Sequence, residues 1–367
     1  MTERFLKSIW ALFFVAAFAG MATALAAPDL AALNRVLTDR VTVPAYSRMA
    51  DEMTSLAETL EAFCAAPDDA KLSASWAAFA KGMAAWQQAQ VFTFGPIIRN
   101  GRAERIEFWP DKNGTRARQL AQALAAKEPA LLAPGGLVGK SVSLQNLVSL
   151  EQLLDEQGAA IIADPADEEA RYACGLARAM AEFQAALAQE ILADWTGPGG
   201  YRDAMVTAVD GNSHYGSAAE AAAEYLRSPS FELEKIVKMK LRRPLGDSLS
   251  QARPKRAESW RSQLSLKNIE ANLQTVAALY EVPGGLGDQV VAAGAEALDR
   301  RLRLGLAEVR RILDEIDIPL SQAVADEAAR ADLEDLEERL EDLHHDLTSD
   351  VARALALPIG FNAMDGD

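Results

Sequence analysis

Acidic side chains interrupt apolar sequence at two places where their types and positions could support ligand binding. Glu151 stands where a leucine would continue the apolar stripe of a helix predicted over residues 143–157. A carboxylate that faces a core must be paired with a base, protonated or bound to a metal ion. Three alternatives are open for Glu151: exposure at the helix edge, an ion pair with Arg99, Arg102 or Arg105, and a metal or ligand site.

The second place is the sequence RIEFWPDKNG at residues 105–114, which holds Glu107 and Asp111 on either side of a Phe-Trp-Pro sequence. The two aromatic side chains favour burial, which would pin this segment against a helical bundle. Pinned acids are suited to the wall of a polar cleft, and their oxygen atoms suit hard cations and iron. The alternative is a solvent-facing loop. We predict a candidate cleft from four residues, of which the three acids are the candidate metal ligands: Glu107, Asp111, Glu151 and Arg105.

Motifs with well-defined chemistry are absent from the sequence. There is no HExxH, GxSxG, P-loop or dinucleotide-binding pattern, so a zincin-type peptidase is excluded. The histidines are few, and the pair Glu341 and His345, although spaced i,i+4, belongs to an acid-rich helix that is expected to be solvated. The identity of any cofactor, whether a divalent metal or iron, therefore stays open.

Helical periodicity dominates the chain that must position these residues. Apolar residues recur at spacings of three and four, as in the stripe from Tyr46 to Phe63 and in the leucine stripe from Leu333 to Val351. Such stripes are typical of amphipathic helices, and alternating strand patterns are nearly absent. We predict an all-α fold of helical bundles, with domains over residues 27–227 and 228–367.

The N-terminus is typical of a secretory signal peptide. Arg4 and Lys7 precede the apolar run Ile9–Ala22, and Ala24-Leu25-Ala26 supplies a small-x-small cleavage pattern. We predict cleavage after residue 26 and a periplasmic address. No later apolar run approaches the ~20 residues of a membrane span.

Charge and cysteine content fit export. The chain has 37 basic and 53 acidic residues, a net charge of −16, which disfavours binding to nucleic acid. Two cysteines, Cys64 and Cys174, suit one disulfide in an oxidising compartment, and two buried free thiols are the alternative.

Several fragments together, in order, resemble the imelysin-like family of the peptidase M75 superfamily. They include FC at residues 63–64, the opening sequence RIEFWPDKNG, VSLEQLL, SWRSQLSLKNIEANLQ and LPIGFNAMDGD. The resemblance implies export, two all-α bundle-like halves with a cleft between them, and a link to bacterial iron uptake. It also implies a functional GxHxxE motif, which falls on residues 146–151. Only Glu151 matches that motif, because Asn146 replaces the glycine and Val148 replaces the histidine.

The leading hypothesis is therefore an exported imelysin-like protein that binds a metal ion or small ligand in an iron-acquisition setting. Its expected partners are a metal ion or iron-uptake components. A metallopeptidase-like hydrolase is the first alternative, although loss of the motif histidine removes the best general base. A non-catalytic structural or interaction module is the second.

Overall fold

The computed structural model describes residues 27–358, and the regular structure of this part of the chain is entirely helical, without a β-strand. The predicted all-α fold is therefore confirmed. The predicted signal peptide and most of the C-terminal sequence LPIGFNAMDGD, from residue 359 onwards, lie outside the described residues. None of the described helices is both long enough and apolar enough to cross a membrane.

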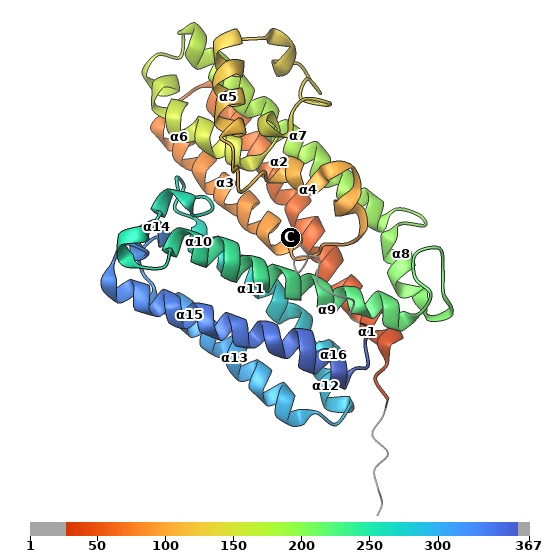
Figure 1. Ribbon diagram of the computed structural model, residues 1–367. Helices are drawn as coiled ribbons and strands as arrows, with labels where there is room; N and C mark the ends of the chain where they lie inside the picture. Colours follow the sequence, from red (N-terminus) through yellow and green to blue (C-terminus); the bar gives the residue numbers. More distant parts are fainter. Residues whose placement is uncertain (1–26, 359–367) are drawn as a thin grey trace, which may run out of the picture.

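The N-terminal half is built around α2 (Val43–Ala65), which packs along both α3 (Asp69–Gln90) and α7 (Glu168–Thr196) (Figure 1). Two of these helices begin at aspartate caps, since the side chains of Asp68 and Asp167 accept backbone N–H groups of Lys71 and Ala170. The other α-helices of this half are α1 (Leu30–Leu37), α4 (Arg102–Ile106), α5 (Thr115–Ala126), α6 (Leu147–Ala163) and α8 (Tyr201–Val206).

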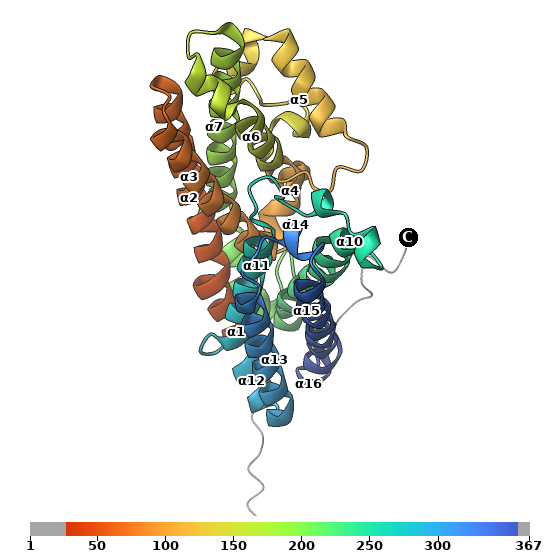
Figure 2. The same cartoon turned by 90° about the vertical axis from the view of Figure 1, so that its left-hand side faces the viewer.

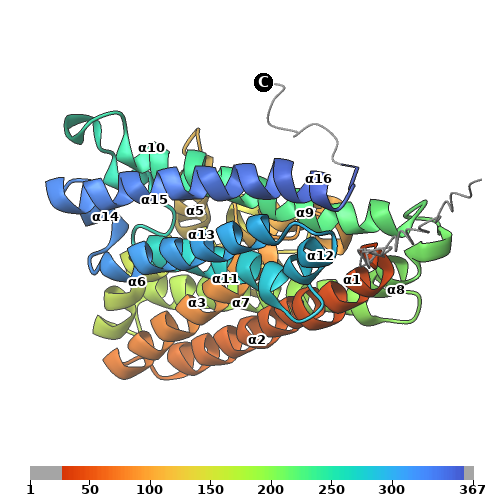
Figure 3. The ribbon, with the colours of Figure 1, turned by 90° about the horizontal axis from the view of Figure 1, so that it is seen from below.

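The C-terminal half consists mainly of four long helices. The helix α13 (Glu296–Glu315) packs against α15 (Glu327–His345), which also contacts α9 (Ala218–Lys235) (Figure 3). Their leucine stripes are buried, as the sequence pattern predicts. The fourth long helix is α11 (Ser265–Glu281). The shorter α-helices are α10 (Arg242–Leu245), α12 (Leu286–Ala292), α14 (Leu320–Ala323) and α16 (Ala352–Ala354).

The two halves share one continuous hydrophobic core. They meet where α11 packs against α3 (Figure 2). The domain boundary expected between residues 227 and 228 falls inside α9, so the chain does not leave the first half through a linker there. The reason is packing. Helix α9 contacts α1 of the first half as well as α15 of the second, so the sequence shows no change in composition where the boundary was expected.

The fold has two further local features, a disulfide bond and π-helical segments. Cys64 and Cys174 form a disulfide between the end of α2 and α7, with Cα atoms 5.6 Å apart, which confirms the predicted bridge. Three π-helical segments interrupt the regular helices, and such segments are frequent at functional sites. They are η1 (Thr38–Thr42), η6 (Ile236–Leu241) and η9 (Asp346–Val351).

Candidate functional site

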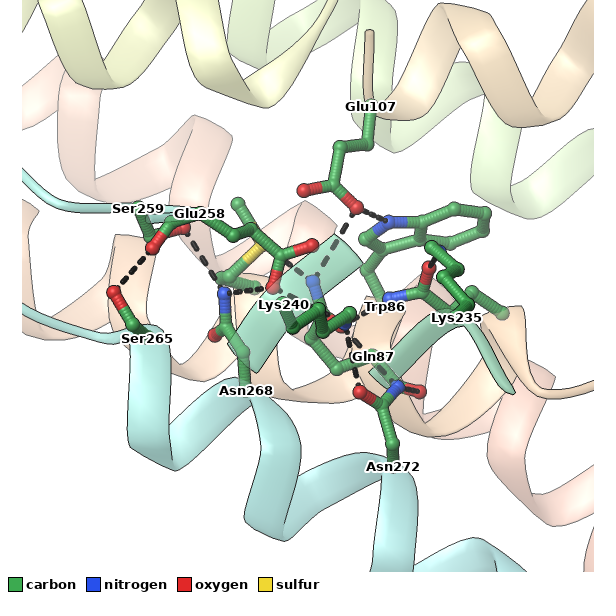
Figure 4. Close-up of polar contacts among 12 residues, drawn as sticks. Trp86, Gln87, Glu107, Lys235, Lys240, Glu258, Ser259, Ser265, Asn268 and Asn272 are labelled. Atoms are coloured by element: carbon green, nitrogen blue, oxygen red, sulfur yellow. Dashed lines mark hydrogen bonds and ion pairs between the residues drawn. The ribbon is translucent and has the colours of Figure 1, made fainter. Parts of the chain in front are cut away.

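A buried lysine lies where the two halves meet. Lys240, in η6, is 1% exposed, and its Nζ donates hydrogen bonds to Gln87 Oε1 at 2.6 Å and Asn272 Oδ1 at 2.7 Å (Figure 4). The same nitrogen lies 3.1 Å from Glu258 Oε2 and 3.6 Å from Glu232 Oε1. A buried ammonium group is tolerated only when it is paired and hydrogen-bonded in this way.

Glu258 is the principal carboxylate partner of this lysine. It is 1% exposed, and its Oε2 also accepts a hydrogen bond of 2.8 Å from Asn268 Nδ2 of α11. Burial acts to raise the pKa of Glu258, but the ammonium groups of Lys240 and Lys235 outweigh burial and lower the pKa below its ordinary value. Glu258 is therefore ionised at neutral pH.

Glu107, from the opening sequence motif, is the second buried carboxylate of this cluster. Its Oε2 accepts hydrogen bonds from Trp86 Nε1 at 2.7 Å and Gln87 Nε2 at 3.3 Å, whereas Oε1 is buried without a partner among residues 27–358 (Figure 4). Burial, reinforced by the charge of Glu258, raises the pKa of Glu107 to about 8. Glu107 is thus largely protonated at neutral pH, next to an ionised acid.

A cleft with a volume of about 350 Å³ lies beside Glu107. Its walls combine aromatic rings with charged side chains from α3, α4 and α9. Trp109 is half-buried and forms part of the wall, which gives the Phe-Trp-Pro sequence its structural role. The lining side chains include Trp86, Phe92, Trp109, Phe231, Glu104, Glu107, Glu232 and Lys235.

Glu151 lies in a different environment, although it is also buried, at 1% exposure. Its Oε1 accepts hydrogen bonds from the backbone N–H of Ser262 at 2.8 Å and from Ser262 Oγ at 2.6 Å. Burial raises the pKa of Glu151, and Ser262 together with the charges of Arg261 and Arg116 opposes that rise. The alternative of exposure at the helix edge is therefore wrong.

The arginines near Glu151 are not the ones that we predicted. Arg102 is instead held by Asp194, at 2.8 Å, and by Glu190, and Arg99 lies 3.7 Å from Asp194. The prediction of Arg99, Arg102 or Arg105 as partners relied on their closeness to the opening motif. The helical fold instead brings Arg116 of α5 and Arg261 of the segment before α11 to Glu151.

Asp111 and Arg105 do not join Glu107 at the cleft. The Asp111 carboxylate accepts backbone N–H groups of Thr115 at 3.0 Å and Arg116 at 2.8 Å, so it caps the start of α5. Partial burial would raise the pKa of Asp111, but these N–H groups hold it below its ordinary value. Neither Asp111 nor Arg105 lines the Glu107 cleft, which corrects the predicted four-residue cleft.

These residues do not fit the metal centre implied by the GxHxxE motif. Within residues 27–358, no group of three or more His, Cys, Asp and Glu side chains is arranged to hold a metal ion. Val148 stands at the position of the motif histidine, and the charges near Glu151 are two arginines, which repel a cation. The predicted joint metal site of Glu151, Glu107 and Asp111 is not assembled.

Sequence reasoning missed the basic and amide members of the cluster. Lys240 was hidden in a run of lysines and arginines that reads as a solvated helix end. Asn268 and Asn272 are spaced i,i+4, which places two amides on one face of α11. Ser265 and Thr275 are buried at neighbouring positions of the same helix, and this polar stripe is the signal that could have indicated a polar partner.

The fold is therefore all-α, with two helical bundles that share one hydrophobic core. The chain belongs to the imelysin family: the model of that family, Imelysin (peptidase M75), matches residues 42–347. The resemblance found in the sequence is thus confirmed.

Named relatives agree with this assignment. Iron-regulated protein A of Synechococcus elongatus is 25% identical over 287 residues, which cover 76% of this chain and 70% of that protein. The crystal structure of an imelysin-like protein from Psychrobacter arcticum matches with a TM-score of 0.69 and 18% identity, over 92% of this chain and 100% of that chain. A Parabacteroides distasonis structure, named as an iron-regulated protein A precursor, matches with a TM-score of 0.73 and 18% identity, over 90% and 96%. The two structural matches show a common fold.

Proposed function

We propose that this imelysin-family chain is an exported binding protein that acts in an iron-acquisition setting and holds a small ligand in the Glu107 cleft. One observation carries the proposal: the buried Glu107 carboxylate has an oxygen without a hydrogen-bond partner and lines a cavity of about 350 Å³. A buried polar atom without a partner is destabilising, so natural proteins keep such atoms mainly where they serve a function. The relative named iron-regulated protein A supports the iron setting.

Export to the periplasm is supported by two features. The sequence of residues 1–26 has the charged start, apolar run and cleavage pattern of a signal peptide. The Cys64–Cys174 disulfide suits an oxidising compartment such as the bacterial periplasm. Iron-uptake components of the same compartment are the expected partners.

The chemistry of the site favours binding over hydrolysis. A metallopeptidase needs a bound metal ion that activates water, together with a general base. In this chain Val148 replaces the motif histidine, and Glu151 is held by Ser262 in a buried position. The metallopeptidase-like alternative therefore lacks its machinery at the motif. A purely structural module would leave the Glu107 cleft without a role.

The test is complementation under iron limitation. A strain that lacks the gene is supplied with the wild type, Glu107→Gln or Glu58→Gln, and the level of each protein in the periplasmic fraction is measured. Glu58 is the control, because its carboxylate is exposed on α2 and does not line the Glu107 cleft. We expect the wild type and Glu58→Gln to restore growth, whereas Glu107→Gln is exported normally but does not restore it.

Two results would overturn the proposal. Full complementation by Glu107→Gln would remove the cleft from the function. Release of peptides from denatured casein by the purified wild type, abolished by Glu151→Gln, would establish the hydrolase instead.

A further inference from the structure

The buried cluster contains one more acid than base. Three carboxylates, those of Glu107, Glu232 and Glu258, surround the two ammonium groups of Lys235 and Lys240. Glu232 lies 3.6 Å from each lysine nitrogen, and Glu258 lies 3.1 Å from Lys240. In the described part of the chain, Glu107 is left with neutral donors alone, Trp86 and Gln87. Whenever Glu107 is ionised, the cluster is therefore short of one positive charge, and the shortage is located at Glu107.

The wall around Glu107 suits a cation with an apolar body. The rings of Trp86, Phe92, Trp109 and Phe231 line the same cleft as the carboxylates. Aromatic faces attract cations, and a carboxylate at the end of an aromatic cavity is a usual arrangement for recognising ammonium groups. A bare metal ion would instead need several oxygen or nitrogen ligands, which residues 27–358 do not gather at one point.

We infer that the Glu107 cleft binds a small organic ammonium cation, whose charge supplies the positive charge that the cluster lacks. This inference rests on the proposed binding function and names the chemical class of its ligand. The ammonium group lies against Glu107 and the apolar body lies among the aromatic rings. Because Glu107 Oε1 is covered, entry of the ammonium group requires one side chain of the wall to move.

Ligand and proton then compete for the same carboxylate. Lys235, Lys240 and Glu258 face Glu107 from α9, η6 and the segment before α11, and Trp86 and Gln87 face it from α3. With the pKa of Glu107 at about 8, an ammonium ligand must displace a proton below that pH. Affinity should rise about tenfold between pH 6 and pH 7 and level off above pH 8.

The experiment is calorimetric titration of the full mature protein with benzylammonium chloride, with benzyl alcohol as the neutral probe of the same shape. We expect saturable binding of one benzylammonium ion, at least about tenfold tighter than benzyl alcohol because only the cation gains the charge interaction. In buffers of different ionisation enthalpy at pH 6.5, about one proton should be released for each ion bound.

Variants locate the binding. Glu107→Gln should weaken benzylammonium binding at least about tenfold at pH 8 and abolish proton release, and Glu58→Gln, at an exposed position of α2 outside the cleft, should change the affinity less than about twofold. Lys235→Met should tighten binding, because it removes a positive charge from the same wall. This last variant keeps the inference open to refutation if Glu107→Gln fails to fold.

Equal affinity for benzylammonium and benzyl alcohol, or weaker binding by Lys235→Met, would overturn the inference. Titration with ferrous and zinc ions separates this failure from failure of the proposed function. Glu107-dependent metal binding without benzylammonium binding would refute the ammonium ligand and leave the binding function in place. Absence of both, together with normal complementation by Glu107→Gln, would refute both proposals.

Discussion

Glu107→Gln should make the protein more stable at pH 8 than the wild type. Glutamine keeps the size of the side chain and can accept the hydrogen bond that Trp86 Nε1 gives to Glu107. It removes the ionisation of a carboxyl group whose pKa is raised from 4.5 to about 8, first by burial and then by Glu258. Since 1 pKa unit corresponds to 1.36 kcal/mol, the difference in free energy of unfolding could reach about 5 kcal/mol.

The sign follows from the direction of the pKa shift. An acid with a raised pKa in the folded state stabilises the protein fully below its unfolded value of 4.5, and this contribution is lost as the pH rises through about 8. The wild type therefore loses stability over this range because of Glu107, and the variant does not. The free energy of unfolding of the variant minus that of the wild type should grow with pH, by up to ~1.4 kcal/mol per pH unit, and become constant above pH 8.

Urea denaturation of both proteins at pH 5, 6, 7, 8 and 9 measures this difference directly, because contributions from all other groups are common to both. Glu104→Gln, at an exposed position of the same helix, is the control and should show a difference within about 0.5 kcal/mol at every pH. A flat difference for Glu107→Gln, or one that falls between pH 5 and pH 8, would refute the reasoning that Glu107 is a buried acid with a raised pKa.

Three other variants test the remaining contacts by denaturation. Lys240→Met should cost about 3–5 kcal/mol, because Glu232 and Glu258 lose their buried ion-pair partner. Glu151→Ala should cost about 1–3 kcal/mol, because the backbone N–H and hydroxyl of Ser262 lose their buried acceptor, and EDTA should not change the Tm of the wild type. Cys64→Ser should cost about 4–5 kcal/mol, because the disulfide closes a loop across 110 residues. Losses under 1 kcal/mol, or a Tm lowered by EDTA, would contradict these assignments.

The sequence was sufficient for features that depend on local periodicity. The stripes of α2, α13 and α15 predicted buried helix faces, and each is buried in the structure. The interruption of a stripe by Glu151 left exposure and two kinds of buried site as alternatives, and the side chain is buried, at 1% exposure. The pair of cysteines predicted the disulfide, because an oxidising compartment and an even count are visible without coordinates.

The partners of the buried acids could not be predicted in the same way. Glu107 and Glu258 are about 150 positions apart, and only the packing of α11 on α3 brings their segments together. Arg116 of α5 reaches Glu151 because α5 contacts α6, and Arg261 reaches it from the segment before α11. Asp111 was wrongly assigned to the cleft because its role is local. Its carboxylate accepts backbone N–H groups at the start of α5, and such an acid cannot be told from a ligand-binding acid until the start of the helix is known.

The π-helical segment η6 makes the chain sensitive to its exact length at one point. Each residue advances an α-helix by about 100°, so an extra residue in one turn rotates everything that follows relative to what precedes it. Lys235 ends the regular helix and Lys240 lies inside the widened turn, yet both reach the same acids. Deleting one residue between them would turn Lys240 away from Glu258, whereas a substitution would leave its direction unchanged. In an alignment of this chain with a relative, a gap of one position within η6 would therefore indicate a different site as surely as the loss of Lys240.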